Sequence, residues 1–176
     1  PYGKDYLSNV CVDWEASTLP VEEMNVRRVV LRTGIVLSTR GGALAPLLMT
    51  TRWFVGGPLG SGRQWWPWIH MEDQVGVIQY LMSQPGANGV YNLVSPHPVQ
   101  MGEFGRTLAS VLDRPYWLPA PAVALKLLLG EMSTVVLDGQ RALPARLLQA
   151  GYRFKFEKLH SALVNLLRPG SQIKLE

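Results

Sequence analysis

The stretch that decides the fold is RRVVLRTGIVL, residues 27–37. Its β-branched apolar run lies between charged residues and Gly34, which is typical of a strand buried within a sheet. The preceding residues 6–19 have helical spacing, and this helix should end near Pro20. A helix followed by a continuously apolar strand predicts an α/β protein with a parallel sheet.

Further elements are expected downstream of this strand. Residues 43–54 favour a short helix, 56–62 form a glycine-rich loop, and Pro67 should interrupt the strand that follows. The sequence also predicts helices over 72–84, from Val99 to before Arg114, and over 122–130, 143–150 and 159–167, strands over 89–95 and 152–156, and an extended segment 116–121.

Two of these elements carry a predicted buried face. In the 72–84 helix, apolar side chains at helical spacing should form the stripe that faces the core: Val75, Ile78, Leu81 and Met82. In the segment 152–156, aromatic and basic residues alternate, which predicts a strand with one buried face.

Composition excludes several broad classes of protein. The 176 residues are 47% hydrophobic and 17% charged, which is enough apolar material for a core and too little charge for a disordered tail. The single cysteine, Cys11, cannot form an intrachain disulfide, so a disulfide-stapled secreted scaffold is excluded. No apolar stretch reaches the roughly 20 residues of a membrane span.

The net charge of +4 comes entirely from the last third of the chain, where residues 121–176 hold 8 basic and 4 acidic side chains. These basic residues are dispersed and do not form the dense stripe of a nucleic-acid footprint. A solvated surface explains them better, and we expect no nucleic-acid partner.

Motifs for familiar chemistry are absent from this stretch of sequence. It contains no G-x-G-x-x-G, no phosphate-binding loop, no C-x-x-C, no G-x-S-x-G and no H-E-x-x-H. Its three histidines lack partners at metal-ligand spacing, so no metal site is expected.

The most informative candidate for a site is GSGRQWWPWIHMED, residues 60–73. Arg63 offers a planar fork for a carboxylate or phosphate, and the three tryptophans offer flat apolar walls for a small ligand. An equally weighted interpretation places the tryptophans in the core and Arg63 in solvent.

Four stretches together resemble one protein group: RTGIVLSTRGGAL (32–44), GGPLGSGRQWWPWIHMEDQV (56–75), GVYNLVSPHPVQMGEFGRTLA (89–109) and LLLGEMSTVVLDGQRALPARLLQAGYRFKF (127–156). They resemble the C-terminal half of the epimerase family proteins, an atypical group of extended short-chain dehydrogenase/reductases related to NAD-dependent epimerases and dehydratases. The resemblance implies part of a Rossmann-like domain over 1–117 and a small α-rich C-terminal domain over 118–176. The half with the glycine-rich dinucleotide fingerprint is expected to lie upstream.

The resemblance also implies where ligands would bind. It places the nicotinamide side of NADP or NAD, if that upstream half is present, near Arg32, Gly34, Ile35 and Val36. It places the substrate near the residues of the next loop and strand, with Arg63 as the anion contact: Arg63, Gln64, Trp68 and His70. Asn92 and Ser95 could line the same cleft, since ligands bind at strand ends in open α/β sheets.

The usual catalytic pair of the superfamily is not intact here. Alignment with its Tyr-x-x-x-Lys motif puts Asn9 at the lysine position and Asp5 at the tyrosine position, with Tyr6 one residue away. Asparagine cannot supply the positive charge that lowers a tyrosine pKa. No catalytic residue is therefore predicted, and turnover is left open.

Two functional hypotheses remain, together with a weaker nucleic-acid alternative. The first is an NAD(P)-dependent epimerase- or oxidoreductase-like protein that acts on a small or nucleotide-linked substrate. The second is a non-catalytic binding or assembly subunit, with a protein partner that covers the incomplete sheet. We expect a cytoplasmic protein, or a stromal one if the source is an alga or plant.

Overall fold

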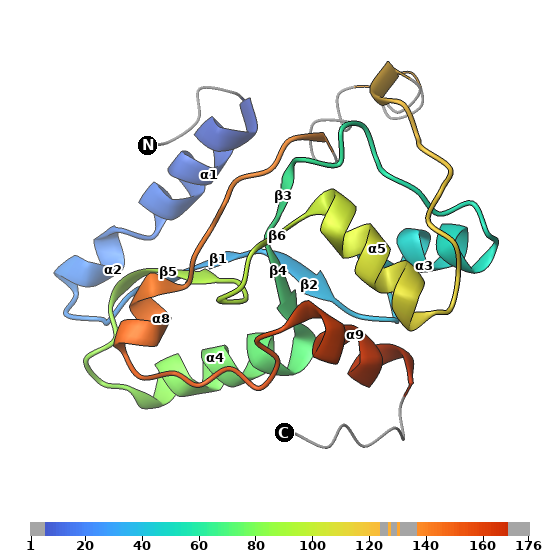
Figure 1. Cartoon of the computed structure of the whole chain (residues 1–176). Coiled ribbons are helices and arrows are strands. Elements are labelled where there is room, and N and C mark those ends of the chain that lie inside the picture. The colour runs from blue at the N-terminus through green and yellow to red at the C-terminus, as the bar shows by residue number, and fades with distance from the viewer. Residues whose placement is uncertain (1–5, 124–126, 128–129, 131–136, 169–176) are drawn as a thin grey trace.

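A computed structural model describes residues 6–123, 127, 130 and 137–168. Figure 1 shows its helices and strands. Those in the N-terminal half are α1 (Tyr6–Ser17), α2 (Pro20–Glu23), β1 (Val29–Thr33), β2 (Ile35–Leu37), α3 (Leu44–Arg52), β3 (Trp65–Trp66), β4 (Trp68–His70) and α4 (Met71–Ser83). They are followed by β5 (Gly89–Leu93), β6 (Val99–Gln100), α5 (Met101–Val111), α8 (Ala145–Gln149) and α9 (Leu159–Leu167).

The stretch 27–37 forms two consecutive strands that pair with different partners. β1 pairs in parallel with β5, from Val29 opposite Gly89 to Thr33 opposite Leu93. β2 pairs in parallel with β4, from Ile35 opposite Trp68 to Leu37 opposite His70. The predicted α/β class with parallel pairing is confirmed, and β3 and β6 add a short antiparallel pair.

Two apolar clusters stabilise these elements. One surrounds Trp66, Trp68 and Phe104 and joins the strands β2 to β4 with α3, α5 and α9. The other surrounds Ile69, Tyr91 and Leu147 and joins β4 and β5 with α4 and α8. Six aromatic residues and several leucines lose most of their contact with water in these clusters, and this burial is the main favourable term for folding.

The predicted burial of the first strand is wrong for β1. Leu31 is 37% exposed, and the strand becomes more exposed toward Thr33. The physical reason is that β1 has only one strand neighbour, β5, in the part of the chain that the structure describes. A continuous apolar run indicates a strand, but it does not show how many of its sides are covered.

The predicted stripe of α4 is also partly wrong. Val75 and Met82 are 45% and 71% exposed, whereas Val77 and Leu81 are buried. The helix packs on β2 and β4 through a face rotated from the predicted one. In a helix of 13 residues, the spacing of the apolar residues cannot show which of two adjacent faces is buried when both faces contain apolar side chains.

Two local predictions are corrected by tertiary contacts. Val99 lies in the short strand β6, and the helix begins at Met101, because Val99 and Gln100 pair with β3. The segment 152–156 forms no strand, although its alternation is correct: Tyr152 is half-buried, and Phe154 and Phe156 are buried. Most of the helix predicted at 122–130 lies outside the described residues.

Candidate functional site

The predicted cofactor region lies where the chain changes strand partners at Gly34. The Gly34 amide donates to the Leu93 carbonyl at 3.0 Å, and the Ile35 amide donates to the Pro67 carbonyl at 2.7 Å. A Cβ on residue 34 would lie 2.5 Å from the Pro67 carbonyl oxygen and 2.7 Å from the Val94 side chain. Only glycine therefore lets β1, β5 and the start of β4 meet at this junction.

The backbone of Val36 has a distinct position at this junction. Successive residues in a strand direct their amide and carbonyl groups to opposite edges, and Ile35 faces β4. Val36 therefore directs its N–H and C=O to the other edge of β2, along which no strand pairs among the described residues. Those two groups could hydrogen-bond to an amide of a bound ligand.

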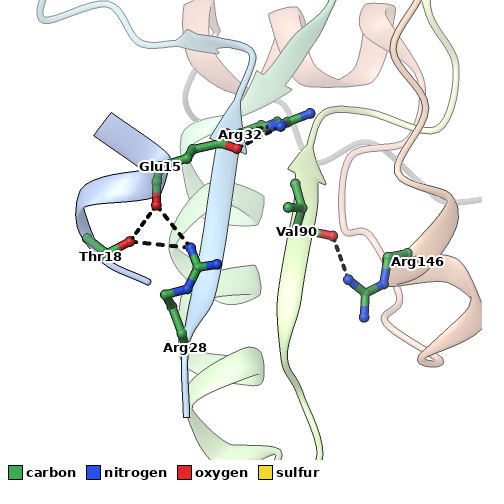
Figure 2. A network of polar contacts seen from close by, with 6 residues as sticks. All are labelled: Glu15, Thr18, Arg28, Arg32, Val90 and Arg146. Atoms are coloured by element: carbon green, nitrogen blue, oxygen red, sulfur yellow. Dashed lines mark hydrogen bonds and ion pairs between the residues drawn. The ribbon is translucent and has the colours of Figure 1, made fainter. Parts of the chain in front are cut away.

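Arg32, another predicted cofactor contact, binds a carboxylate of its own chain. Its guanidinium donates two hydrogen bonds of 2.7 Å to the two oxygens of Glu15 in α1, as Figure 2 shows from close by. Hydrogen bonding to Arg32 lowers the pKa of Glu15. Arg28 directly precedes β1, and its guanidinium donates to the Glu15 carbonyl and the Thr18 hydroxyl. These bonds attach α1 beside β1.

The loop before β3 is held by its own backbone and presents one cation to solvent. Gly60 and Gly62 have φ angles of 59° and 66°, a region that glycine enters without steric cost. The Gln64 side chain donates to the Leu59 carbonyl at 3.0 Å and ties the loop closed. Arg63 is exposed, and none of the described residues contributes an acceptor to its guanidinium.

The structure places Trp68 and His70 in the interior, with 0% and 1% of their surface exposed. His70 Nδ1 accepts the Glu72 amide at 3.1 Å and so caps α4, while its ring packs on Phe156 at 3.9 Å. Burial is the main cause of a lowered His70 pKa, opposed by the carboxylates of Glu72 and Asp73. Both residues belong to β4, and their side chains are buried in the interior. A substrate role for them stays a prediction.

Asn92 and Ser95 both bind the C-terminal part of the chain. The side-chain amide of Asn92 donates to the Leu143 carbonyl at 3.2 Å. The buried Ser95 hydroxyl donates to the Glu157 carbonyl at 2.8 Å. These contacts connect the strand ends with residues from the last third of the chain.

Asp73 has a structural role that the sequence did not reveal. It is 1% exposed, and its two carboxylate oxygens accept the amides of Lys155 and Phe156 at 2.7 and 2.9 Å. Asp73 is the third residue of α4, and an acidic side chain in the first turn of a helix is favourable in itself. No local signal identified this role, because the partners of Asp73 lie 82 and 83 residues away.

Sequence comparison places the chain among known relatives. Residues 120–166 match a family described as Domain of unknown function (DUF1731). The chain is 48% identical over 163 residues to the chloroplastic epimerase family protein SDR39U1 homolog of Arabidopsis thaliana, covering 93% of this chain and 47% of the relative. It is 40% identical over 164 residues to an epimerase family protein of Staphylococcus aureus, covering 93% of this chain and 55% of that protein.

The chain is homologous to the epimerase family proteins. The predicted resemblance to this family is thereby confirmed. The chain spans about half the length of these curated relatives.

Solved structures of the family show the same fold. A crystal structure of the human epimerase family protein SDR39U1 with NADPH is similar at a TM-score of 0.88 and 35% identity, covering 94% of this chain and 56% of that one. A nucleoside-diphosphate sugar epimerase from Corynebacterium glutamicum is similar at a TM-score of 0.75 and 28% identity, covering 94% and 31%. The predicted Rossmann-like class is confirmed.

The described residues contain no cluster of three or more potential metal ligands among histidine, cysteine, aspartate and glutamate. None of their helices combines the length and the hydropathy that crossing a membrane requires. Asn9 lies exposed on α1, and Asp5 lies outside the described residues.

Proposed function

We propose that this chain is the substrate-side part of an NAD(P)-dependent epimerase- or oxidoreductase-like protein. The observation that carries the proposal is the junction at Gly34, where parallel strands meet and where the edge of β2 that carries the Val36 N–H and C=O pairs with no strand of the described residues. Ligands bind outside the strand ends of such sheets. The NADPH in the human family member supports a nicotinamide dinucleotide as the ligand.

The residues of this chain would bind and orient two ligands. The backbone of Val36 would hydrogen-bond to the nicotinamide carboxamide, and Gly34 would keep the strands close enough to shape the site. A bound dinucleotide supplies hydride transfer, while the protein positions the reacting groups. Exposed Arg63, at the end of a glycine loop, would bind an anionic group of a small or nucleotide-linked substrate.

The proton chemistry of this site would differ from that of the superfamily. Asn9 has no charge with which to lower the pKa of a neighbouring phenol, so the usual Tyr/Lys pair is not available. The residues of this chain therefore favour a role in ligand binding, and they point to no particular catalytic step. We assign no catalytic residue, and we propose a plastid or cytoplasmic location, the former because the Arabidopsis relative is named chloroplastic.

The test is a titration of the intact protein with NADPH and separately with NADH, followed by nicotinamide fluorescence and thermal shift. Binding of either dinucleotide supports the proposal, and their ratio of dissociation constants gives the preference. An absence of both fluorescence change and thermal shift would overturn it.

A matched pair of variants tests the role of Arg63. Arg63→Gln should weaken binding of a nucleotide sugar about tenfold, because a charge-assisted hydrogen bond contributes roughly 1.5–3 kcal/mol, and should leave NADPH affinity unchanged. Arg40→Gln removes another exposed arginine and serves as the control. Equal effects of the two variants would exclude Arg63 as a specific anion contact.

A second candidate is a binding or assembly subunit without turnover. The apolar residues of α1 favour it, because Tyr6 and Trp14 are 80% and 74% exposed, and Leu31 on β1 is 37% exposed. Such surfaces are typical of protein contacts. Light scattering of the intact protein distinguishes the candidates, since a monomer that binds NADPH supports the first and a stable complex without dinucleotide binding supports the second.

A further inference from the structure

Asn88 lies at the end of the loop between α4 and β5 and directly precedes Gly89. The chain has five asparagines, and the other four precede valine or leucine. An asparagine is chemically labile when the next backbone nitrogen can reach its side-chain carbonyl carbon. A following glycine allows this approach best, because it has no side chain in the way. The pair Asn88–Gly89 is therefore the candidate for spontaneous deamidation in this sequence.

The side chain of Asn88 is placed so that it can take part in this reaction. The residue is exposed, so water reaches its amide group. The amide nitrogen donates to the Gly86 carbonyl over 3.4 Å, which is longer than a typical hydrogen bond and restrains the side chain weakly. The side chain is therefore free to rotate toward the next backbone nitrogen.

The peptide group between Asn88 and Gly89, by contrast, is held at both ends. Its carbonyl accepts a hydrogen bond of 2.8 Å from the Arg146 guanidinium, and its N–H donates to the Arg28 carbonyl at 2.9 Å. The same guanidinium donates to the Val90 carbonyl at 2.9 Å, as Figure 2 shows. The side chain from α8 and the backbone before β1 together fix the orientation of this peptide plane.

Deamidation requires both of these hydrogen bonds to open. The Gly89 nitrogen has to lose its proton, which is bound to the Arg28 carbonyl in the folded state. It also has to turn toward the Asn88 side chain, and this turn rotates the peptide plane and moves its carbonyl away from Arg146. The start of β5, where Gly89 lies opposite Val29, must therefore open locally before the reaction can proceed.

We propose that Asn88 is a deamidation site whose reaction rate in the folded protein is set by local opening at the start of β5. In the open state the Gly89 nitrogen attacks the side-chain carbonyl carbon of Asn88. The new bond replaces the bond from that carbon to the side-chain nitrogen, which leaves as ammonia with the proton from Gly89. Water then opens the resulting succinimide at either carbonyl and leaves aspartate or isoaspartate at residue 88. Water is the only co-reactant.

The test follows deamidation of the intact protein by peptide mapping at mildly alkaline pH, in native buffer and in guanidinium chloride. In denaturant we expect Asn88 to convert to aspartate and isoaspartate, whereas Asn25, which is also exposed but precedes valine, should stay unchanged. In native buffer the rate at Asn88 should be at least about tenfold lower. Hydrogen exchange of the Gly89 amide should be slowed by the same factor, because one opening limits both processes.

Variants separate local opening from global unfolding. Arg146→Met releases the carbonyl end of the peptide group and should raise the native rate about threefold to tenfold, with no change in denaturant. Arg153→Met, at another exposed arginine, controls for the loss of charge. Asp73→Asn weakens the contact of α4 with the segment 152–157 and controls for a less stable fold.

Three outcomes would overturn the proposal. The first is an Asn88 that does not react in denaturant, and the second is an equal rate in native buffer and in denaturant. The third is an equal acceleration by Arg146→Met and Asp73→Asn, which would show that the reaction proceeds through global unfolding.

Discussion

Two neighbouring side chains, His70 and Asp73, connect α4 with the C-terminal segment 152–157. His70 caps α4 and packs on Phe156, and Asp73 accepts the amides of Lys155 and Phe156. Lys155 also forms an ion pair with Glu72 at the surface. The segment pairs with no strand among the described residues, so the Asp73 carboxylate supplies the acceptors that a neighbouring strand would otherwise provide.

Loss of the Asp73 carboxylate should destabilise the protein strongly. Asp73→Ala leaves two amides without acceptors in a buried region, which costs about 1–3 kcal/mol for each donor. We expect the free energy of unfolding in urea to fall by roughly 2–6 kcal/mol, and by about half as much for Asp73→Asn, which keeps one oxygen. Asp13→Ala, at an exposed position on α1, is the control. Equal losses at both positions would contradict this account.

The lowered pKa of His70 predicts a pH dependence of stability. The folded state holds His70 neutral below its ordinary pKa of 6.5, so the unfolded chain binds the proton more readily. The contribution of neutral His70 to the free energy of unfolding should therefore be fully present above pH 6.5. The free energy of unfolding should decrease as the pH falls from there toward the lowered folded-state pKa.

Denaturation curves between pH 5 and pH 7.5 measure this effect. His70→Asn keeps a side-chain acceptor for the helix cap and should have a flatter profile than the parent protein. His160→Asn, on the exposed side of α9, controls for loss of a histidine. A parent-like slope in His70→Asn would show that other groups cause the pH dependence.

Four helices end in the same way. After α2, α3, α5 and α8, the residue with a positive φ angle is Asn25, Phe54, Asp113 and Gly151. In each case the amides of this residue and of the next one bond back to the last helical turn, as in a Schellman motif. Glycine and asparagine adopt this conformation at low cost, but a bulky residue does not. Phe54 is therefore the strained member of the set.

Replacement of Phe54 by glycine should stabilise the protein. The left-handed conformation costs a non-glycine residue about 1–2 kcal/mol, while the contact of the Phe54 ring with the Arg114 guanidinium contributes about 0.5–1 kcal/mol at an exposed site. We expect Phe54→Gly to raise the free energy of unfolding by about 0.5–1 kcal/mol. Phe54→Ala, which keeps the strain and loses the ring, should be less stable than the parent protein. Greater stability of the alanine variant would refute the strain.

The C-terminal part of the chain covers an edge of the parallel pair. β5 pairs with β1 on one side, and Arg146 of α8 donates to the Asn88 carbonyl at 2.8 Å. It also donates to the Val90 carbonyl at 2.9 Å, as Figure 2 shows. The guanidinium also lies 4.4 Å from the Tyr91 ring. An uncovered edge invites pairing with other chains, so Arg146 protects β5.

Removal of this cover should weaken β5. Arg146→Met keeps the apolar stem and loses two hydrogen bonds, for which we expect a loss of about 1–2 kcal/mol by urea unfolding, with faster amide exchange in β5. Arg153→Met removes an exposed arginine and should change stability by less than about 0.5 kcal/mol. If Arg153→Met caused the same loss, the edge contact would not explain the effect.

Much of the fold and part of the candidate site could be predicted from local pattern. Residues 159–167 were predicted as a helix with the bounds that α9 has, because one apolar face and the preceding chain define it. The break at Pro67 followed from the backbone restriction of a single residue. The glycine loop before Arg63 was visible for the same reason.

The tertiary structure alone decided which of these residues meet. Gly34 was visible as a glycine, but its need for close approach depends on Pro67 and Val94, which come from two other segments. Trp68 and His70 have the composition of a pocket rim, yet Trp68 packs in the cluster with α5 and α9, and His70 packs on Phe156, so both lie inside. The sequence by itself determined the elements, since propensity and periodicity act between near neighbours. Partners such as Asp73 and Phe156 lie 83 residues apart, and only the folded chain brings them together.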